Sequence, residues 1–115
     1  RFLRSLSVLC VPATLGESFG LYVLEALASG VPVVQPRNGA FVELCEQTGG
    51  GILCEPNDAR ALAEGIASLL QDHGRRASLA SNGRRAVLER FTIQRMAHEV
   101  ADVLSTFCAS PRTVV

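Results

Sequence analysis

The sequence contains no lysine and no tryptophan, and it contains only one tyrosine. All 11 of its basic residues are arginines. Without lysine, these residues cannot supply the amine of a Schiff base or the lysine of a P-loop. With so few flat aromatic side chains, we also expect no stacking platform for single-stranded nucleic acid.

Neither sign of charge dominates the chain as a whole. Eleven acidic residues balance the 11 arginines, so the formal net charge is zero. The distribution is uneven, because residues 1–70 carry a net charge of −3 and residues 71–115 carry +3. This difference is too small for the basic stripe, interleaved with aromatics, that nucleic-acid binding requires. We therefore expect no nucleic-acid partner.

The sequence also lacks targeting and membrane-spanning segments. No apolar run approaches the roughly 20 residues of a membrane span, and no signal peptide is visible. With 48% hydrophobic and 19% charged residues, the 115-residue chain is typical of one folded domain at most. Its cysteines form no C-x-x-C pair and favour buried free thiols in a reducing compartment; they are Cys10, Cys45, Cys54 and Cys108. These features predict a cytoplasmic location.

Short apolar runs alternate with segments rich in helix-forming residues. The expected strands cover residues 7–11, 31–35 and 52–54. The expected helices cover residues 21–28, 40–47, 59–73, 76–89 and 93–107. Asp58 and Thr92 are candidate N-caps, and Gly74 is expected to end the third helix. The alternation predicts an α/β fold with three parallel strands and flanking helices.

Two of the expected helices carry apolar stripes at helical spacing. The first stripe comprises Leu62, Ile66, Leu69 and Leu70. The second comprises Met96, Val100, Val103, Leu104 and Phe107. We expect the second stripe to pack in the core or against another domain. The arginine pairs at 75–76 and 84–85 predict a solvated helix face, with contact to the inner face of an anionic membrane or to an acidic partner as the less favoured alternative.

A loop at residues 13–20 separates the first expected strand from the first long helix. In doubly wound sheets, ligands bind beyond the carboxyl ends of the strands, where such loops lie. Gly20 stands where the helix begins, so the amides of residues 20–22 are the unpaired donors of a helix N-terminus. Donors in that position bind anions, phosphates above all, and glycine allows close approach of the backbone.

Glu25 is the only charged residue between Glu17 and Arg37. Its helix is apolar nearly all round, which predicts burial, and a buried carboxylate needs partners. A ribose diol would serve, and a narrow solvated stripe is the equally weighted alternative. On one helix, Glu17 and Glu25 would stand about 12 Å apart, too far for the paired carboxylates of a retaining glycosidase. One carboxylate near each end of a nucleotide-sugar fits better.

These residues resemble those of a known family. Residues 17–34 are ESFGLYVLEALASGVPVV, which is similar to the E-x7-E motif of retaining group 1 (family 4) glycosyltransferases with the GT-B fold. Further agreement lies at Asn38-Gly39, Glu43, the glycines before Ile52, residues 55–58 and residues 88–91. The resemblance extends over about residues 2–107. It implies that residues 1–115 are part of one donor-binding domain, the latter part of the C-terminal Rossmann-like domain.

The resemblance also implies roles for individual residues. Glu17, the residue assigned to catalysis, would hydrogen-bond the hydroxyls of the transferred sugar and act by positioning and electrostatics. The amides around Phe19, Gly20 and Leu21 would hold the sugar and the diphosphate, and Glu25 would bind the ribose. A sugar would pass with retention from a nucleotide-diphosphate sugar to an acceptor that is a sugar, lipid or glycan. No metal and no other cofactor is implied.

The chain departs from the family pattern at one loop. The family often has Gly-Gly where this chain has Asn38-Gly39, and Pro-Glu where it has Val42-Glu43. Asparagine tolerates left-handed backbone, so the turn is expected to survive, while contact of Asn38 and Gly39 with the donor stays open. The family's cationic clamp on the diphosphate lies upstream of the matched segment.

The resemblance implies that the acceptor domain and the first half of the donor domain lie outside this sequence. We therefore expect the isolated segment to be inactive, and a binding module without activity is the second hypothesis. A dinucleotide-dependent oxidoreductase is disfavoured because no G-x-G-x-x-G turn follows the first strand. The first strand would expose an edge where earlier strands should pair, and such an edge favours self-association.

Overall fold

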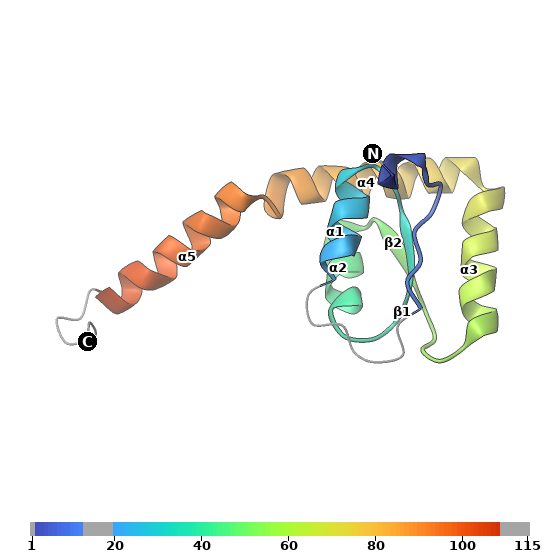
Figure 1. Cartoon of the computed structure of the whole chain (residues 1–115), viewed down its shortest axis with the longest axis horizontal. Coiled ribbons are helices and arrows are strands. Elements are labelled where there is room, and N and C mark those ends of the chain that lie inside the picture. Colours follow the sequence, from blue (N-terminus) through green and yellow to red (C-terminus); the bar gives the residue numbers. More distant parts are fainter. Residues whose placement is uncertain (1, 13–19, 109–115) are drawn as a thin grey trace.

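The computed structural model describes residues 2–12 and 20–108 (Figure 1). Its elements are the 3-10 helix η1 (Leu3–Ser5), α1 (Leu21–Ala28), β1 (Val33–Pro36), α2 (Ala40–Thr48), β2 (Gly51–Cys54), α3 (Ala59–Gln71), α4 (His73–Arg90) and α5 (Ile93–Cys108). The strands are parallel and helices flank them, so the predicted α/β class is confirmed. None of the described helices is long and apolar enough to cross a membrane.

Within the described residues, two strands form the sheet and a third segment joins it at one point. β1 and β2 pair in parallel, with Val33 opposite Gly51. The segment predicted as a strand at residues 7–11 contributes a single bridge, Leu9 to Val33. There the Leu9 amide donates to the Pro32 carbonyl and the Val34 amide donates to the Leu9 carbonyl, both at 3.0 Å.

The strand predicted at residues 7–11 is shorter than expected. After the bridge at Leu9, a side chain of β1 takes the place of the backbone hydrogen bonds that would continue the pairing. The Gln35 carboxamide accepts from the Val11 amide at 2.7 Å and donates to the Val11 carbonyl at 3.2 Å. Gln35 is fully buried, so these bonds also satisfy its polar atoms. The edge segment is therefore held beside β1, but its backbone does not form a continuous ladder.

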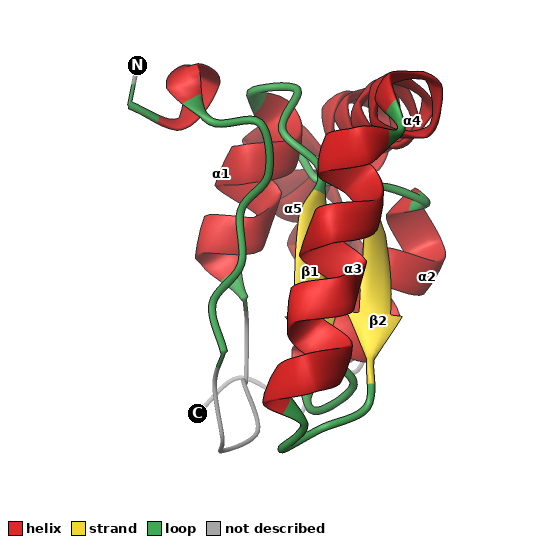
Figure 2. Cartoon of the chain, turned by 90° about the vertical axis from the view of Figure 1, so that its right-hand side faces the viewer, coloured by secondary structure: helices red, strands yellow, loops and turns green. Residues whose placement is uncertain are grey.

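The helices cover both faces of the sheet, as Figure 2 shows with α3 in front of the strands. Val33 points to the face covered by α1 and α2, where its core cluster includes Leu27 and Phe41. The next residue, Val34, points to the face covered by α3 and packs with Cys54 and Leu69. Strands buried on both faces are expected to be continuously apolar, as β1 largely is.

Asp72 separates α3 from α4, which differs from the predicted boundary at Gly74. The Asp58 carboxylate accepts from the Ala61 amide at 2.9 Å, so the predicted N-cap of α3 is confirmed. The Asp72 carboxylate caps α4 in the same way, accepting from the Arg75 amide at 2.9 Å. A side-chain N-cap at Asp72 thus starts the new helix two residues before Gly74, which lies inside α4.

The second apolar stripe does not reach the core. In Figure 1, α4 runs across one end of the sheet and α5 continues away from it. The side chains of the stripe on α5 are 52–60% exposed. The predicted start of α5 is confirmed, because the Thr92 hydroxyl accepts from the Arg95 amide at 3.0 Å. The expectation of core packing is wrong for this stripe, and packing against another domain stays a prediction.

Candidate functional site

Three helices begin at the same edge of the sheet: α1 follows segment 7–11, α2 follows β1 and α3 follows β2. Because the strands are parallel, α1, α2 and α3 start beyond their carboxyl ends (Figure 1). The N-cap of α3 is Asp58, whose side chain accepts a first-turn amide. The N-caps of α1 and α2 are Gly20 and Gly39, which have no side chain with which to accept one. The carboxyl edge therefore collects helix N-termini, two of which begin with glycine.

Gly20 forms the turn into α1. Its φ is 65°, a left-handed conformation that favours glycine, and the residue is buried. Its carbonyl accepts from the amides of Val23 at 2.9 Å and Leu24 at 3.3 Å, which begins the helix. The residues predicted to hold an anion, Gly20 and Leu21, thus lie at a helix N-terminus on the expected edge of the sheet. Anion binding there stays a prediction.

Of the two glutamates of the motif, only Glu25 lies among the described residues. Glu17 and Phe19 lie outside the described residues. Glu25 lies in the middle of α1 and is exposed, so the expected burial of its carboxylate is wrong. Leu21, one turn before Glu25, is also exposed, whereas Val23, Ala26 and Leu27 are fully buried. The narrow solvated stripe considered as an alternative is present, and a carboxylate on it is accessible to a ligand.

The turn after β1 is held by backbone hydrogen bonds. The Asn38 amide donates to the Pro36 carbonyl at 2.9 Å, and the Asn38 carbonyl accepts from the Phe41 amide at 3.3 Å. Gly39 has a φ of 54°, whereas Asn38 has a negative φ. The turn therefore places its left-handed residue at Gly39 and does not require the tolerance of asparagine. Contact of Asn38 and Gly39 with a donor stays a prediction.

Arg37 is a further candidate, which belongs to no sequence motif. It directly follows β1, and its amide donates to the Cys54 carbonyl at the end of β2 at 2.7 Å. Its side chain is exposed at the carboxyl edge, so it adds a positive charge to the edge where an anion is predicted. The signal that could have found it is its place as the first residue after a strand in an α/β fold.

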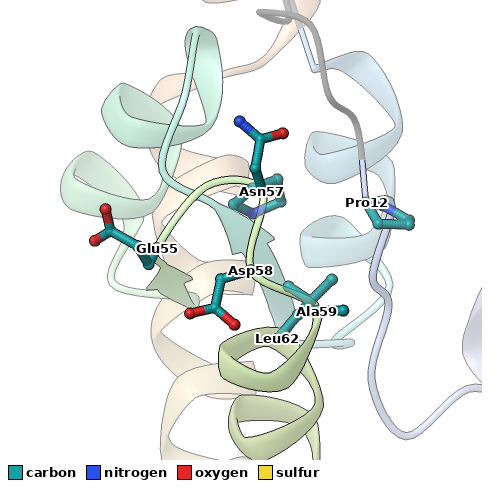
Figure 3. A pocket seen from close by; sticks show the side chains of 7 residues that line it. Pro12, Glu55, Asn57, Asp58, Ala59 and Leu62 are labelled. Atoms are coloured by element: carbon teal, nitrogen blue, oxygen red, sulfur yellow. The ribbon is translucent and has the colours of Figure 1, made fainter.

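A cavity of about 330 Å³ opens at the same edge, beside the start of α3 (Figure 3). It is lined by Pro12, Pro36, Glu55, Asn57, Asp58, Ala59 and Leu62. These residues come from the ends of segment 7–11, β1 and β2 and from the N-terminus of α3. None of the predicted site residues among those described lines it. The structure thus separates the α1 N-terminus from this cavity on the α3 side.

Burial favours the protonated form of three thiols, those of Cys10, Cys45 and Cys54. Cys45 and Cys54 are buried and Cys10 is partly buried, and all three are free. Burial raises the pKa of the Cys45 thiol to about 11, against a smaller opposing effect of Arg37. Burial also raises the pKa of the Cys10 and Cys54 thiols. These cysteines are therefore weak nucleophiles and weak metal ligands at neutral pH. Within residues 2–12 and 20–108, no three His, Cys, Asp or Glu residues form a group that could hold a metal.

The family of the chain follows from a match to a known protein family. The family described as "Glycosyl transferases group 1" matches residues 1–86. The chain belongs to the group 1 glycosyltransferases. This matched range includes both motif glutamates, α1, the Asn38-Gly39 turn and the carboxyl edge of the sheet.

Individual glycosyltransferases resemble the chain over most of its length. It is 38% identical over 91 residues to the lipopolysaccharide core biosynthesis mannosyltransferase LpsB of Rhizobium meliloti, covering 76% of this chain and 25% of that protein. It is 36% identical over 110 residues to the D-inositol 3-phosphate glycosyltransferase of Salinispora tropica, covering 96% of this chain and 22% of that protein. The chain thus spans about a quarter of the length of these relatives.

Solved structures match the fold with similar coverage. The HepE protein of Anabaena in complex with UDP superposes with a TM-score of 0.85 at 28% identity, covering 91% of this chain and 29% of that one. Sucrose-phosphate synthase of Thermosynechococcus elongatus superposes with a TM-score of 0.85 at 32% identity, covering 95% and 27%. A further HepE structure, in complex with UDP-glucose, has a TM-score of 0.84.

Proposed function

We propose that this chain is the latter part of the donor-binding domain of a retaining, family 4 glycosyltransferase that uses a nucleotide-diphosphate sugar. The observation that carries the proposal is the E-x7-E segment, whose second half forms α1 with Gly20 at its start on the carboxyl edge of the sheet. The similarity to HepE, solved with UDP and with UDP-glucose, supports a nucleotide-sugar as the ligand class.

Charge and geometry at the carboxyl edge suit such a donor. The positive end of the α1 dipole and the amides of Gly20 and Leu21 would hold the diphosphate. The exposed carboxylate of Glu25 would accept hydrogen bonds from the ribose hydroxyls. Glu17 would hold the hydroxyls of the transferred sugar. No metal or other cofactor is part of the proposal, because the helix end supplies electrostatic stabilisation itself.

The proposed reaction is a transfer with retention. The bond between the anomeric carbon and the diphosphate oxygen breaks while the acceptor hydroxyl oxygen bonds the same carbon from the same face. The acceptor proton passes to the leaving phosphate oxygen, so the leaving group acts as the base. The chain's own contribution is to stabilise the negative charge that develops on this phosphate. The acceptor is a sugar, a lipid or a glycan.

Substitution of the two glutamates in the glycosyltransferase that contains this sequence tests the site. Glu25→Ala is expected to raise the donor KM with a smaller effect on kcat, because ribose binding is lost. Glu17→Ala is expected to lower kcat mainly. Glu46→Ala is the matched control, since Glu46 is exposed on α2 and is not part of the motif. Unchanged transfer in both motif variants would contradict the site assignment.

A second candidate function is nucleotide binding without catalysis. It is favoured by the helix N-terminus at Gly20 and the exposed carboxylate of Glu25, which would suffice to hold a nucleotide. Calorimetric titration of the 115-residue chain with UDP, GDP and their sugars distinguishes the two. Binding without sugar transfer would support it, and turnover by the isolated chain would contradict the expectation that this segment is inactive alone.

A further inference from the structure

Three of the five arginines of α4 contact the C-terminal ends of other helices. Arg84 Nη1 donates to the carbonyl of Ala28, the last residue of α1. Arg90 Nη2 donates to the carbonyl of Gln47 in the last turn of α2. A third, weaker contact joins Arg76 Nη1 to the Leu70 carbonyl of α3 at 3.5 Å. The last carbonyls of a helix have no partner within it and carry its partial negative charge, so each contact places a cation where it is stabilising.

These contacts revise the predicted role of the arginine pairs. Arg75, Arg84 and Arg85 are exposed, as a solvated face requires, but Arg84 also holds the end of α1. The pairs are nine residues apart, which places them on opposite sides of the helix and excludes one basic stripe. The excess of positive charge in residues 71–115 thus supplies contacts to helix ends in the more acidic half of the chain.

Two glycines hold α4 at a fixed place on the amino edge of the sheet. A Cβ added to Gly50, just before β2, would lie 2.7 Å from the Cα of Gly83 in α4 and 2.6 Å from Leu27 Cδ2 in α1. A Cβ added to Gly83 would lie 3.0 Å from the Cα of Gly50. The backbone of α4 therefore touches the backbone of the strand entry. Val87, one turn after Gly83, joins the core cluster beneath α1 and α2.

We infer that Arg84 is a positioning residue for the site at the carboxyl edge. α1 has eight residues, so its two ends are only about 12 Å apart. A shift or tilt at Ala28 must therefore move Gly20, Leu21 and Glu25 at its other end and middle. Arg84 ties Ala28 to α4, which the Gly50–Gly83 contact holds on the sheet. Arg90 fixes α2, and with it the Asn38-Gly39 turn, by the same means.

The inference concerns the position of α1. Its test by ligand binding rests on the proposed function. The key variant is Arg84→Gln, which removes the charge, and Arg84→Lys retains a charge and a donor. The matched control is Arg85→Gln. Arg85 is the neighbouring arginine and is exposed, and within residues 2–12 and 20–108 the one hydrogen-bond partner of its side chain is Asn82 of its own helix, at 3.2 Å. Both Gln variants change the net charge equally, so a general charge effect cancels in the comparison.

Amide chemical shifts and hydrogen exchange of the ligand-free chain form the first readout. Arg84→Gln is expected to shift the amides of residues 20–25 and to speed their exchange, Arg84→Lys to restore part of the difference, and Arg85→Gln to leave them unchanged. Equal effects of Arg84→Gln and Arg85→Gln, or no effect at residues 20–25, would overturn the inference. If Arg84→Gln does not fold, Arg84→Lys against wild type gives the same test, with a smaller shift at residues 20–25 expected.

UDP affinity is the second readout. In folded variants, Arg84→Gln is expected to weaken UDP binding about two- to fivefold, the range that one lost helix-end charge contact produces. Arg84→Lys is expected to recover part of the loss, and Arg85→Gln to stay within the error of wild type. Unchanged affinity in Arg84→Gln would overturn the positioning role. If the wild-type chain binds no UDP, nucleotide binding by this segment alone is contradicted, while the amide readout still decides the inference.

Discussion

α3 and α5 have similar sequence patterns, but they differ in how far their apolar side chains are buried. Each carries an apolar stripe at helical spacing, and each begins at a side-chain N-cap, Asp58 or Thr92. Three residues of the α3 stripe, Leu62, Ile66 and Leu69, pack on the sheet, and Leu69 is fully buried against Val34 and Cys54. The fourth, Leu70, is 47% exposed. The stripe of α5 is more than half exposed along its length.

The difference shows what an amphipathic pattern decides and what it leaves to the fold. Spacing determines which face of a helix is apolar, but burial needs a second surface at the right place. β1 and β2 provide that surface for α3, and α5 leaves the sheet beyond α4 (Figure 1). A large exposed apolar face marks an interaction surface, which keeps the prediction of packing against another domain in force for α5.

The largest expected loss of stability comes from truncating the buried leucine of the α3 stripe. Leu69→Ala should lower the free energy of unfolding by about 3 kcal/mol, because it leaves a cavity between α3 and the sheet. Urea unfolding followed by circular dichroism measures the loss. A loss below about 1 kcal/mol would mean that α3 is no better packed than α5.

Buried thiols give the packed part of the chain a pH dependence. The pKa of Cys45 is raised to about 11 in the folded state from 9.0, so the unfolded chain loses this proton first as the pH rises. Stability is therefore fully present below pH 9 and should fall by about 2 kcal/mol between pH 9 and pH 11. Unfolding at several pH values measures the slope. Cys45→Ala should remove much of it, and an equal slope in that variant would contradict the assignment.

Glycine in α3 tests how closely that helix approaches the sheet. A Cβ on Gly65 would lie 2.9 Å from both Cys54 Sγ and Val34 Cγ1. Gly65→Ala should therefore destabilise the protein by about 1–2 kcal/mol, although alanine is the better helix former. Gly74→Ala in α4 is the control, because among the described residues a Cβ at Gly74 would meet only Asp72 Oδ1, at 3.6 Å. This substitution should stabilise the protein slightly. Equal gains at both positions in thermal unfolding would show that α3 is loosely packed.

The two N-caps allow a matched comparison of cooperativity. Asp58→Ala removes the cap of α3 and should lower the free energy of global unfolding by about 1 kcal/mol. Thr92→Ala removes the cap of α5 and should mainly speed amide exchange in the first turn of α5. Global unfolding together with hydrogen exchange measures both. Equal global losses would show that α5 unfolds cooperatively with the rest of the chain.

The smallest effect is expected on the exposed stripe. Leu104 is 56% exposed, so Leu104→Ala should change the free energy of unfolding by less than about 0.5 kcal/mol. The same substitution at Leu69 is its matched counterpart. A loss at Leu104 as large as at Leu69 would mean that another surface covers α5 in solution.

Features that depend on neighbouring residues alone were predictable. α1 begins and ends where expected, because Gly20 can adopt its left-handed N-cap conformation and Gly30, at a φ of 78°, allows the chain to turn after Ser29. The caps at Asp58 and Thr92 were also predicted, since a short polar side chain reaches its own helix. The boundary at Gly74 was wrong because the neighbouring Asp72 supplies a better cap.

Features that depend on distant residues were not predictable. The strand expected at residues 7–11 is reduced to one bridge because Gln35, 24 residues from Val11, binds the backbone of Val11 with its side chain. The sequence left Glu25 equally open to burial and to a solvated stripe, and Glu25 is exposed because the core contacts of α1 come from Val23, Ala26 and Leu27. Arg84 could not be linked to Ala28, 56 residues earlier, by any local pattern.

The sequence by itself determined the family, the α/β alternation and the motif at the start of α1, because spacing, capping and backbone conformation act over a few residues. Tertiary structure alone decided which apolar stripe is buried, where Glu25 points its charge and which arginines hold helix ends. Those outcomes depend on which surfaces meet, and at Gly50 and Gly83 the missing side chains let two distant backbones touch and so set where α4 lies.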